Sequence, residues 1–139
     1  MESKHKIITV QATINCPIQK AWEFWTSPEH IVQWNHATKD WHTTRAENDL
    51  RVDGKFLYRM EAKDGSMGFD FLGSYKAVIR HELIEYQIGD GRLVEIVFSS
   101  DGNQTKIVES FEAEAIHSHE MQQQGWQAIL TNFKKFAEN

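Results

Sequence analysis

The stretch LIEYQIGDGRLVEIVFSSDGNQTKIVESFEAE, from Leu83 to Glu114, decides the fold of this chain. It holds three runs in which apolar and polar residues alternate, separated by Asp90-Gly91 and Asp101-Gly102. An Asp-Gly pair between alternating runs favours a tight hairpin, because both residues adopt positive φ at low cost. A period of two indicates antiparallel strands with one buried face. We therefore predict three consecutive antiparallel strands here.

The residues before this stretch extend the same pattern. Asp53-Gly54 and Asp64-Gly65 divide residues 41–82 into further strand-sized pieces, whereas the joint near His81 has no glycine. The run FDFLGSYKAVI is predicted to place its alternate residues, from Phe69 to Ile79, on one face. Across all the strands, the aromatic residues expected on the inner face are Phe56, Tyr58, Phe69, Phe71, Tyr75, Tyr86 and Phe98.

The two ends of the chain supply a strand and the helices. ITVQATI alternates like a strand, and Pro17 and Ser27-Pro28 are helix-start signals for two short helices. SHEMQQQGWQAILTNFKKFAEN has the helical period of 3.6, with Ser118 as its expected cap. We predict one α+β domain over residues 1–139, a helix-grip fold. In it, a curved antiparallel sheet of about six or seven strands wraps around the long C-terminal helix, and two short helices follow the first strand. A sheet of this shape leaves room for an internal cavity.

The composition excludes several functional classes. The chain has 139 residues and a net charge of −5, and its fifteen Lys and Arg residues are scattered, so no nucleic-acid partner is expected. Cys16 is the only cysteine, which rules out an internal disulfide and a cysteine-based zinc site. No apolar run has the length of a signal peptide core or a membrane helix. We expect a cytoplasmic protein with no membrane association and no cofactor, present as a monomer or weak dimer.

Segments spread over nearly the whole chain carry a family resemblance. CPIQKAWEFWTSPEHIVQWN, NDLRVDGKFLYRMEAKDGSMGFDFLGSY, EYQIGDGR, TKIVESFEAE and QQQGWQAILTNFKKFAEN resemble the SRPBCC superfamily, also called START-like or pollen-allergen-like. Within it, the chain is similar to the C-terminal domain of the activator of the ninety-kilodalton heat-shock chaperone ATPase. The resemblance implies the helix-grip fold, and it makes a chaperone partner and a stress-response role conceivable. The eukaryotic activators carry a separate N-terminal domain, which we expect to be absent here.

The stretch WNHATKDWHT, residues 34–43, gathers two tryptophans and two histidines. His36, His42 and Asp40 could hold a metal, but they lack the spacings of known metal motifs, so we expect no metal site. The other two interpretations remain open. Trp34 and Trp41 are either core aromatics or an apolar lip at the mouth of the cavity.

Glu109 is the most informative single residue. In TKIVESFEAEA it alternates with Ile107 and Phe111, so a carboxylate is predicted to point into the apolar interior. Buried carboxylates are rare unless they are paired, so Glu109 is either a structural partner of an inward polar group or a polar anchor in a binding cavity. Gly125 lies inside the last helix, where glycine costs about 1 kcal/mol. It serves either close packing or space for a ligand above the helix.

Three functions follow from these observations. The first is a binding protein that holds a small hydrophobic or aromatic molecule. The second is a chaperone-associated interaction module, and the third is a cyclase-type enzyme with Glu109 as acid or base. No catalytic constellation supports the third, so we predict no catalytic residue. The candidate ligand-binding residues are Glu109, Trp34, Trp41, Phe56, Tyr58, Phe69, Phe71, Tyr75, Tyr86, Phe98, Phe111, Gly125 and Ile129.

Overall fold

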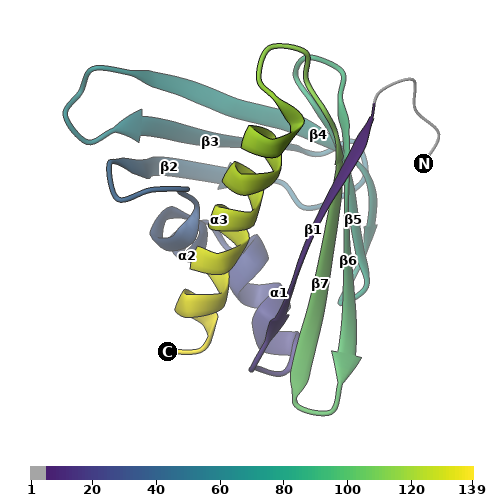
Figure 1. Ribbon diagram of the computed structural model, residues 1–139. Helices are drawn as coiled ribbons and strands as arrows, with labels where there is room; N and C mark the ends of the chain where they lie inside the picture. The colour runs from purple at the N-terminus through teal and green to yellow at the C-terminus, as the bar shows by residue number, and fades with distance from the viewer. Residues whose placement is uncertain (1–5) are drawn as a thin grey trace.

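A curled antiparallel sheet encloses the C-terminal helix in the computed structural model, which describes residues 6–139 (Figure 1). The strands are β1 (Ile7–Ile14), β2 (Trp41–Asn48), β3 (Lys55–Ala62), β4 (Gly68–Ile79), β5 (Leu83–Ile88), β6 (Leu93–Asp101) and β7 (Gln104–Glu112). Their order in the sheet is β1-β7-β6-β5-β4-β3-β2. This arrangement confirms the predicted α+β helix-grip fold. The predicted single domain also includes residues 1–5, which lie outside the described residues.

Three of the four Asp-Gly pairs form the expected tight turns. Gly65, Gly91 and Gly102 have φ values of 79°, 97° and 62°, which only glycine adopts without cost. At the fourth pair, Asp53 takes the left-handed conformation instead, with φ 67°. At the joint without a glycine, His81 does the same with φ 68°. The chain therefore turns at His81 without the residue that usually signals such a turn.

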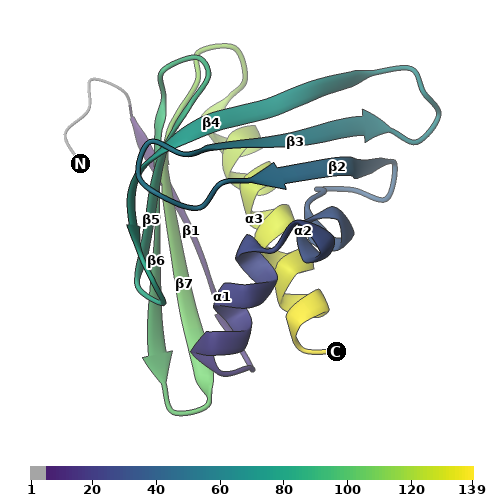
Figure 2. The same cartoon turned by 180° about the vertical axis from the view of Figure 1, so that it is seen from behind.

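Two register shifts bend the sheet. One lies in β2 between Thr43 and Arg45, and the other in β4 between Tyr75 and Ala77. A bulge adds one residue to a strand and increases the local bend and twist, so β2 and β3 run across β6 and β7 (Figures 1 and 2). The bulge in β4 also corrects one prediction. Ile79 does not share the inner face with Tyr75, because the extra residue shifts the alternation and leaves Ile79 49% exposed.

Three helices cover the concave side of the sheet (Figure 2). They are α1 (Ile18–Thr26), α2 (Pro28–Trp34) and α3 (His119–Ala137). Ser118 caps α3 as predicted, because its hydroxyl accepts a hydrogen bond from the Met121 amide at 3.1 Å. Phe133 of α3 packs against both Trp25 and Trp34, with ring centroids 4.8 Å and 5.0 Å away, and the two tryptophan rings are 4.9 Å apart. This aromatic cluster fastens the C-terminal half of α3 to the two short helices.

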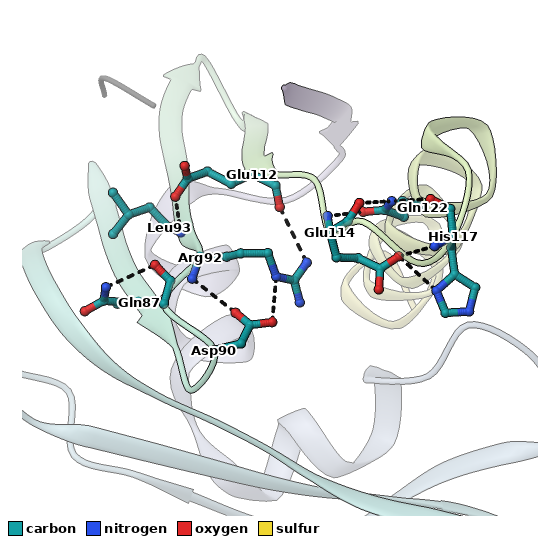
Figure 3. A network of polar contacts seen from close by, with 9 residues as sticks. Gln87, Asp90, Arg92, Leu93, Glu112, Glu114, His117 and Gln122 are labelled. Atoms are coloured by element: carbon teal, nitrogen blue, oxygen red, sulfur yellow. Dashed lines mark hydrogen bonds and ion pairs between the residues drawn. The ribbon is translucent and has the colours of Figure 1, made fainter. Parts of the chain in front are cut away.

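A polar network holds the connection between β7 and α3 (Figure 3). Gln122 accepts a hydrogen bond from the Glu114 amide at 2.9 Å and donates to the carbonyl oxygens of Glu114 and His117 at 3.1 Å and 2.9 Å. The Glu114 carboxylate in turn accepts from the His117 amide at 2.6 Å. These hydrogen bonds pair backbone groups of the loop that have no partner in a helix or strand. They also hold the start of α3 in position relative to the sheet.

Candidate functional site

A cavity of about 210 Å³ lies between the sheet and the helices. Its wall is mostly aromatic and aliphatic and includes residues from all three helices. The residues that line it are Trp25, Thr26, Trp34, Asn35, Asn48, Tyr58, Met60, Phe69, Phe71, Tyr75, Ile84, Tyr86, Ile96, Glu109, Trp126 and Ile129. Apolar pockets with a few polar groups are the usual form of small-molecule sites. Phe69 is 47% exposed, so the cavity wall reaches the protein surface near the start of β4.

Glu109 is the charged residue of this wall. It lies on β7 opposite Ile96 of β6 and Val10 of β1, and it is only 6% exposed. Burial raises the pKa of its carboxyl group to about 8, because an apolar surrounding disfavours the ionised form. Within residues 6–139, no side chain or amide donates a hydrogen bond to Glu109, and no cation pairs with it. The carboxyl group therefore faces the cavity without a protein partner.

Asn35 provides a second polar group without a partner. This residue caps the C-terminal end of α2, is 8% exposed and lines the cavity. Its Nδ2 atom is buried and has no hydrogen bond within residues 6–139. Its backbone carbonyl oxygen accepts a hydrogen bond from the Thr43 hydroxyl at 2.5 Å, so the backbone carbonyl is satisfied and the side-chain Nδ2 is not. Buried polar atoms are almost always paired in native proteins, so an unpaired donor on a residue that lines a cavity is a candidate for ligand contact.

Asn48 links two other residues of the cavity wall by hydrogen bonds. Asn48 donates to the Thr26 carbonyl oxygen at 2.7 Å and accepts from the Tyr75 hydroxyl at 2.5 Å. These hydrogen bonds tie β2 to α1 and β4. Burial raises the pKa of Tyr75 to about 12 and holds the pKa values of Tyr58 and Tyr86 well above their ordinary range, so all three phenols stay neutral near pH 7. The negative charge of Glu109 contributes to raising the pKa of Tyr86, and both side chains line the cavity.

Eight of the predicted ligand-binding residues line the cavity, namely Trp34, Tyr58, Phe69, Phe71, Tyr75, Tyr86, Glu109 and Ile129. Alternation brought the strand residues to the inner face as expected. Ligand contact at these positions stays a prediction.

The other five lie away from the cavity wall. Phe56 packs beneath Tyr58 and Tyr86, at 5.0 Å and 4.9 Å between ring centroids. Phe98 contacts Trp22 and Trp25 under α1, and Phe111 is covered by Trp126. Trp41 lies beside Phe69 at 6.0 Å, and Gly125 has no atom within 4 Å of the position that a side chain would begin to fill. Gly125 therefore provides neither close packing nor part of the cavity wall.

Sequence reasoning missed eight lining residues, which are Trp25, Thr26, Asn35, Asn48, Met60, Ile84, Ile96 and Trp126. Met60, Ile84 and Ile96 were on the predicted inner face, and their alternation was a usable signal. Trp25 and Trp126 required knowledge of how the helices cross the sheet. For Asn35 and Asn48, no sequence signal separates a residue that lines a cavity from an ordinary loop residue.

The histidines that the structure describes do not assemble into a metal site. Over residues 6–139, no three His, Cys, Asp or Glu side chains lie close enough to hold an ion. His36 is held near α3 by a hydrogen bond from the Asn132 side chain to its carbonyl oxygen, and burial lowers the pKa of its imidazole. The His117 ring contacts the Glu114 carboxylate, with Nδ1 2.9 Å from Oε1. In the same described residues, none of the helices is both long and apolar enough to cross a bilayer.

Solved structures of similar proteins share the fold. An AHSA1-like protein from Aeromonas hydrophila is 42% identical, with a TM-score of 0.90 over 96% of this chain and 92% of that one. A protein from Cytophaga hutchinsonii is 52% identical, with a TM-score of 0.83 over 95% of this chain and 92% of that one. A protein from Nitrosomonas europaea, 15% identical with a TM-score of 0.81 over 98% and 96% of the two chains, shares the fold alone. No curated protein matches the chain.

The family comparison agrees with the architecture. Residues 15–138 match the family described as "Activator of Hsp90 ATPase homolog 1-like protein". The match runs from the end of β1 to the end of α3 and so includes all the lining residues of the cavity. The chain belongs to the Activator of Hsp90 ATPase homolog 1-like protein family, within the SRPBCC-type fold.

Proposed function

We propose that this protein binds a small aromatic molecule in the cavity between the sheet and α3. The observation that carries the proposal is the combination of an aromatic wall with two buried residues, Glu109 and Asn35, whose carboxyl group and Nδ2 atom have no hydrogen-bond partner within residues 6–139. Leaving such groups unpaired costs folding free energy, roughly 1–3 kcal/mol for each. A ligand that satisfies one or both of them recovers part of this cost and gains affinity from it.

The size of the cavity limits the ligand. An apolar cavity of about 150 Å³ accepts benzene, whereas pockets for larger ligands measure about 300–1,000 Å³. At about 210 Å³, this cavity suits one aromatic ring with a short substituent. Long acyl chains are too large for it. The ring would lie against the aromatic wall that Tyr58, Phe71 and Trp126 help to form, where face and edge contacts add to apolar burial.

A ligand panel combined with a cavity-filling variant tests the proposal. One-ring compounds should raise the melting temperature with increasing concentration, as mass action requires, whereas two-ring compounds should have less effect because the cavity is too small for them. Ile129→Phe should remove this response, because the larger side chain occupies part of the cavity. Ile79→Phe is the matched control, since Ile79 is exposed on the outer face. A panel without any thermal shift, or an equal response in the Ile129→Phe protein, would contradict the proposal.

The family match supports a second candidate function. The family is named after an activator of the Hsp90 ATPase, and we infer that the surface of this protein binds a chaperone of that class. The test is the ATPase rate of a purified chaperone with and without this protein. An unchanged rate at saturating protein concentration would rule out activation.

A further inference from the structure

We propose that the ligand of the cavity is a small aromatic amine, bound as its ammonium ion between Glu109 and the surrounding aromatic rings. This inference rests on the proposed binding function and specifies the chemical class of the ligand. It stands on the position of Glu109, on the character of the wall around it and on the size of the cavity.

The groups that face the cavity exclude an anionic ligand. The charged or titratable residues of the lining within residues 6–139 are Glu109 of β7, Tyr58 of β3, Tyr75 of β4 and Tyr86 of β5. The helices α1, α2 and α3 contribute tryptophans, an isoleucine, Thr26 and Asn35, and no Lys, Arg or His. A carboxylate or phosphate ligand would enter a low-dielectric space beside Glu109 with no cation to stabilise it.

Arg92 is the cation that affects a residue of the cavity wall, and its guanidinium is already bound outside the cavity. Arg92 affects Tyr86 electrostatically, but its guanidinium donates to Asp90 at 2.8 Å and to the Glu112 carbonyl oxygen at 3.4 Å (Figure 3). It does not line the cavity. Glu109 is thus the carboxyl group that a positively charged ligand would find unpaired.

The aromatic wall favours a cation over a neutral polar group. The faces of Trp, Tyr and Phe rings carry partial negative charge and attract an ammonium ion, most strongly where water is excluded. Trp25, Trp34 and Trp126 come from the three helices, and tyrosine and phenylalanine rings come from the sheet. An ammonium group beside Glu109 would therefore meet an opposite charge on one side and ring faces on others.

Binding of an ammonium ion should release the proton of the Glu109 carboxyl group. In the free protein the Glu109 carboxyl group keeps its proton at neutral pH. When the ammonium ion binds, Glu109 ionises to form the ion pair, and its proton leaves to the solvent. Binding at pH 7 should therefore release close to one proton per ligand. Affinity should increase about tenfold for each pH unit between pH 6 and the Glu109 pKa.

Four one-ring probes of similar size separate the alternatives: benzylamine, benzyl alcohol, toluene and benzoate. Isothermal titration calorimetry with the full chain should give benzylamine at least about tenfold higher affinity than benzyl alcohol, with benzoate weakest. Titration in two buffers of different ionisation enthalpy should show the released proton. Glu109→Gln should reduce benzylamine affinity by about tenfold or more and change toluene affinity by less than about threefold, because Gln keeps the shape without the charge.

The outcomes distinguish this inference from the function on which it rests. If benzyl alcohol or toluene binds as tightly as benzylamine, or if amine binding releases no proton, the amine assignment is wrong and the binding function stands. If none of the four probes binds, the binding function itself fails. The proton release and the pH dependence are measured on the unaltered protein, so the test holds even if the Gln variant folds poorly.

Discussion

Trp126 lies flat against Phe111, with ring centroids 4.0 Å apart and ring planes inclined by 12°. This pair joins α3 to β7 two residues from Glu109 and is the most parallel ring pair among the aromatic contacts of residues 6–139. Phe111 is fully buried beneath Trp126, and Trp126 faces the cavity. The contact therefore fastens the helix to the sheet and supplies part of the cavity wall at the same time.

The stack should contribute a coupling energy beyond simple burial. In a double-mutant cycle with Phe111→Leu and Trp126→Leu, we expect an interaction of about 1 kcal/mol, measured by urea denaturation. A cycle of Phe111→Leu with Phe136→Leu is the control, because Phe136 contacts Phe24 and His30 instead. Additive effects in the first cycle would show that the stacked geometry contributes nothing specific.

The titration of Glu109 should make stability depend on pH. Its folded pKa of about 8 is above the ordinary glutamate value of 4.5. The contribution of the protonated group is fully present below about pH 4.5 and is lost as the pH rises through about 8. Glu109→Gln should thus leave stability unchanged near pH 4 and increase it by roughly 3 kcal/mol at pH 7, since each pH unit corresponds to about 1.4 kcal/mol.

Denaturation curves of both proteins at pH 4, 7 and 9 measure this difference, and carboxyl-carbon NMR gives the Glu109 pKa directly. A pKa near 4.5, together with equal stabilities at all three pH values, would show that the carboxyl group is hydrated in solution.

Replacing Gly125 with alanine should stabilise the folded protein. A side chain at this position would meet no atom within 4 Å, and the residue lies within α3. Gly125→Ala should therefore stabilise the protein by about 1 kcal/mol and raise the melting temperature by about 4 °C. Gly73→Ala is the opposite control, because its Cβ would lie 2.5 Å from the Gln87 carbonyl oxygen and should cost about 2 kcal/mol. Thermal scans check both. A destabilised Gly125→Ala protein would contradict the open position.

Gln122 should be the residue that holds the start of α3. Gln122→Ala removes its three hydrogen bonds to the backbone of Glu114 and His117 and should cost about 2–3 kcal/mol. Gln124→Ala, on the exposed side of the same helix, should change stability by less than about 0.5 kcal/mol. Amide hydrogen exchange at Glu114 should accelerate in the first variant. Equal exchange in both variants would mean that the loop is held without Gln122.

The sequence predicted the fold well because its signals were local. The Asp-Gly turns, the alternation along β5 to β7 and the cap at Ser118 each act over a few residues. The alternation around Glu109 also placed its side chain inward without any knowledge of neighbouring strands. Where a signal was absent, as at His81, the boundary was uncertain, and where a bulge added a residue, as before Ile79, the face assignment was wrong.

The membership of the cavity wall was less predictable, because it depends on distances between elements. Phe98 and Tyr86 both point inward, yet Phe98 is covered by Trp22 and Trp25 while Tyr86 faces the open space. Nothing in alternation separates them, since each strand reports only which face a residue occupies. The angle at which α1 and α3 cross the sheet decides which inward residues are covered and which remain free.

The pairing of β1 with β7 has a consequence for how the chain folds during synthesis. Ile14 pairs with Thr105 and Ile7 with Glu112. During synthesis, β1 therefore cannot pair until roughly ninety to a hundred further residues have been made. The other six strands pair with neighbours in sequence and can form hairpins as they leave the ribosome. Contacts between distant residues slow folding, because a long loop must close before they form. We therefore expect β1, which is synthesised before its partner, to be the last of these seven strands to join the sheet. Until then, the edge of β7 is open to pairing with a chaperone or a second chain.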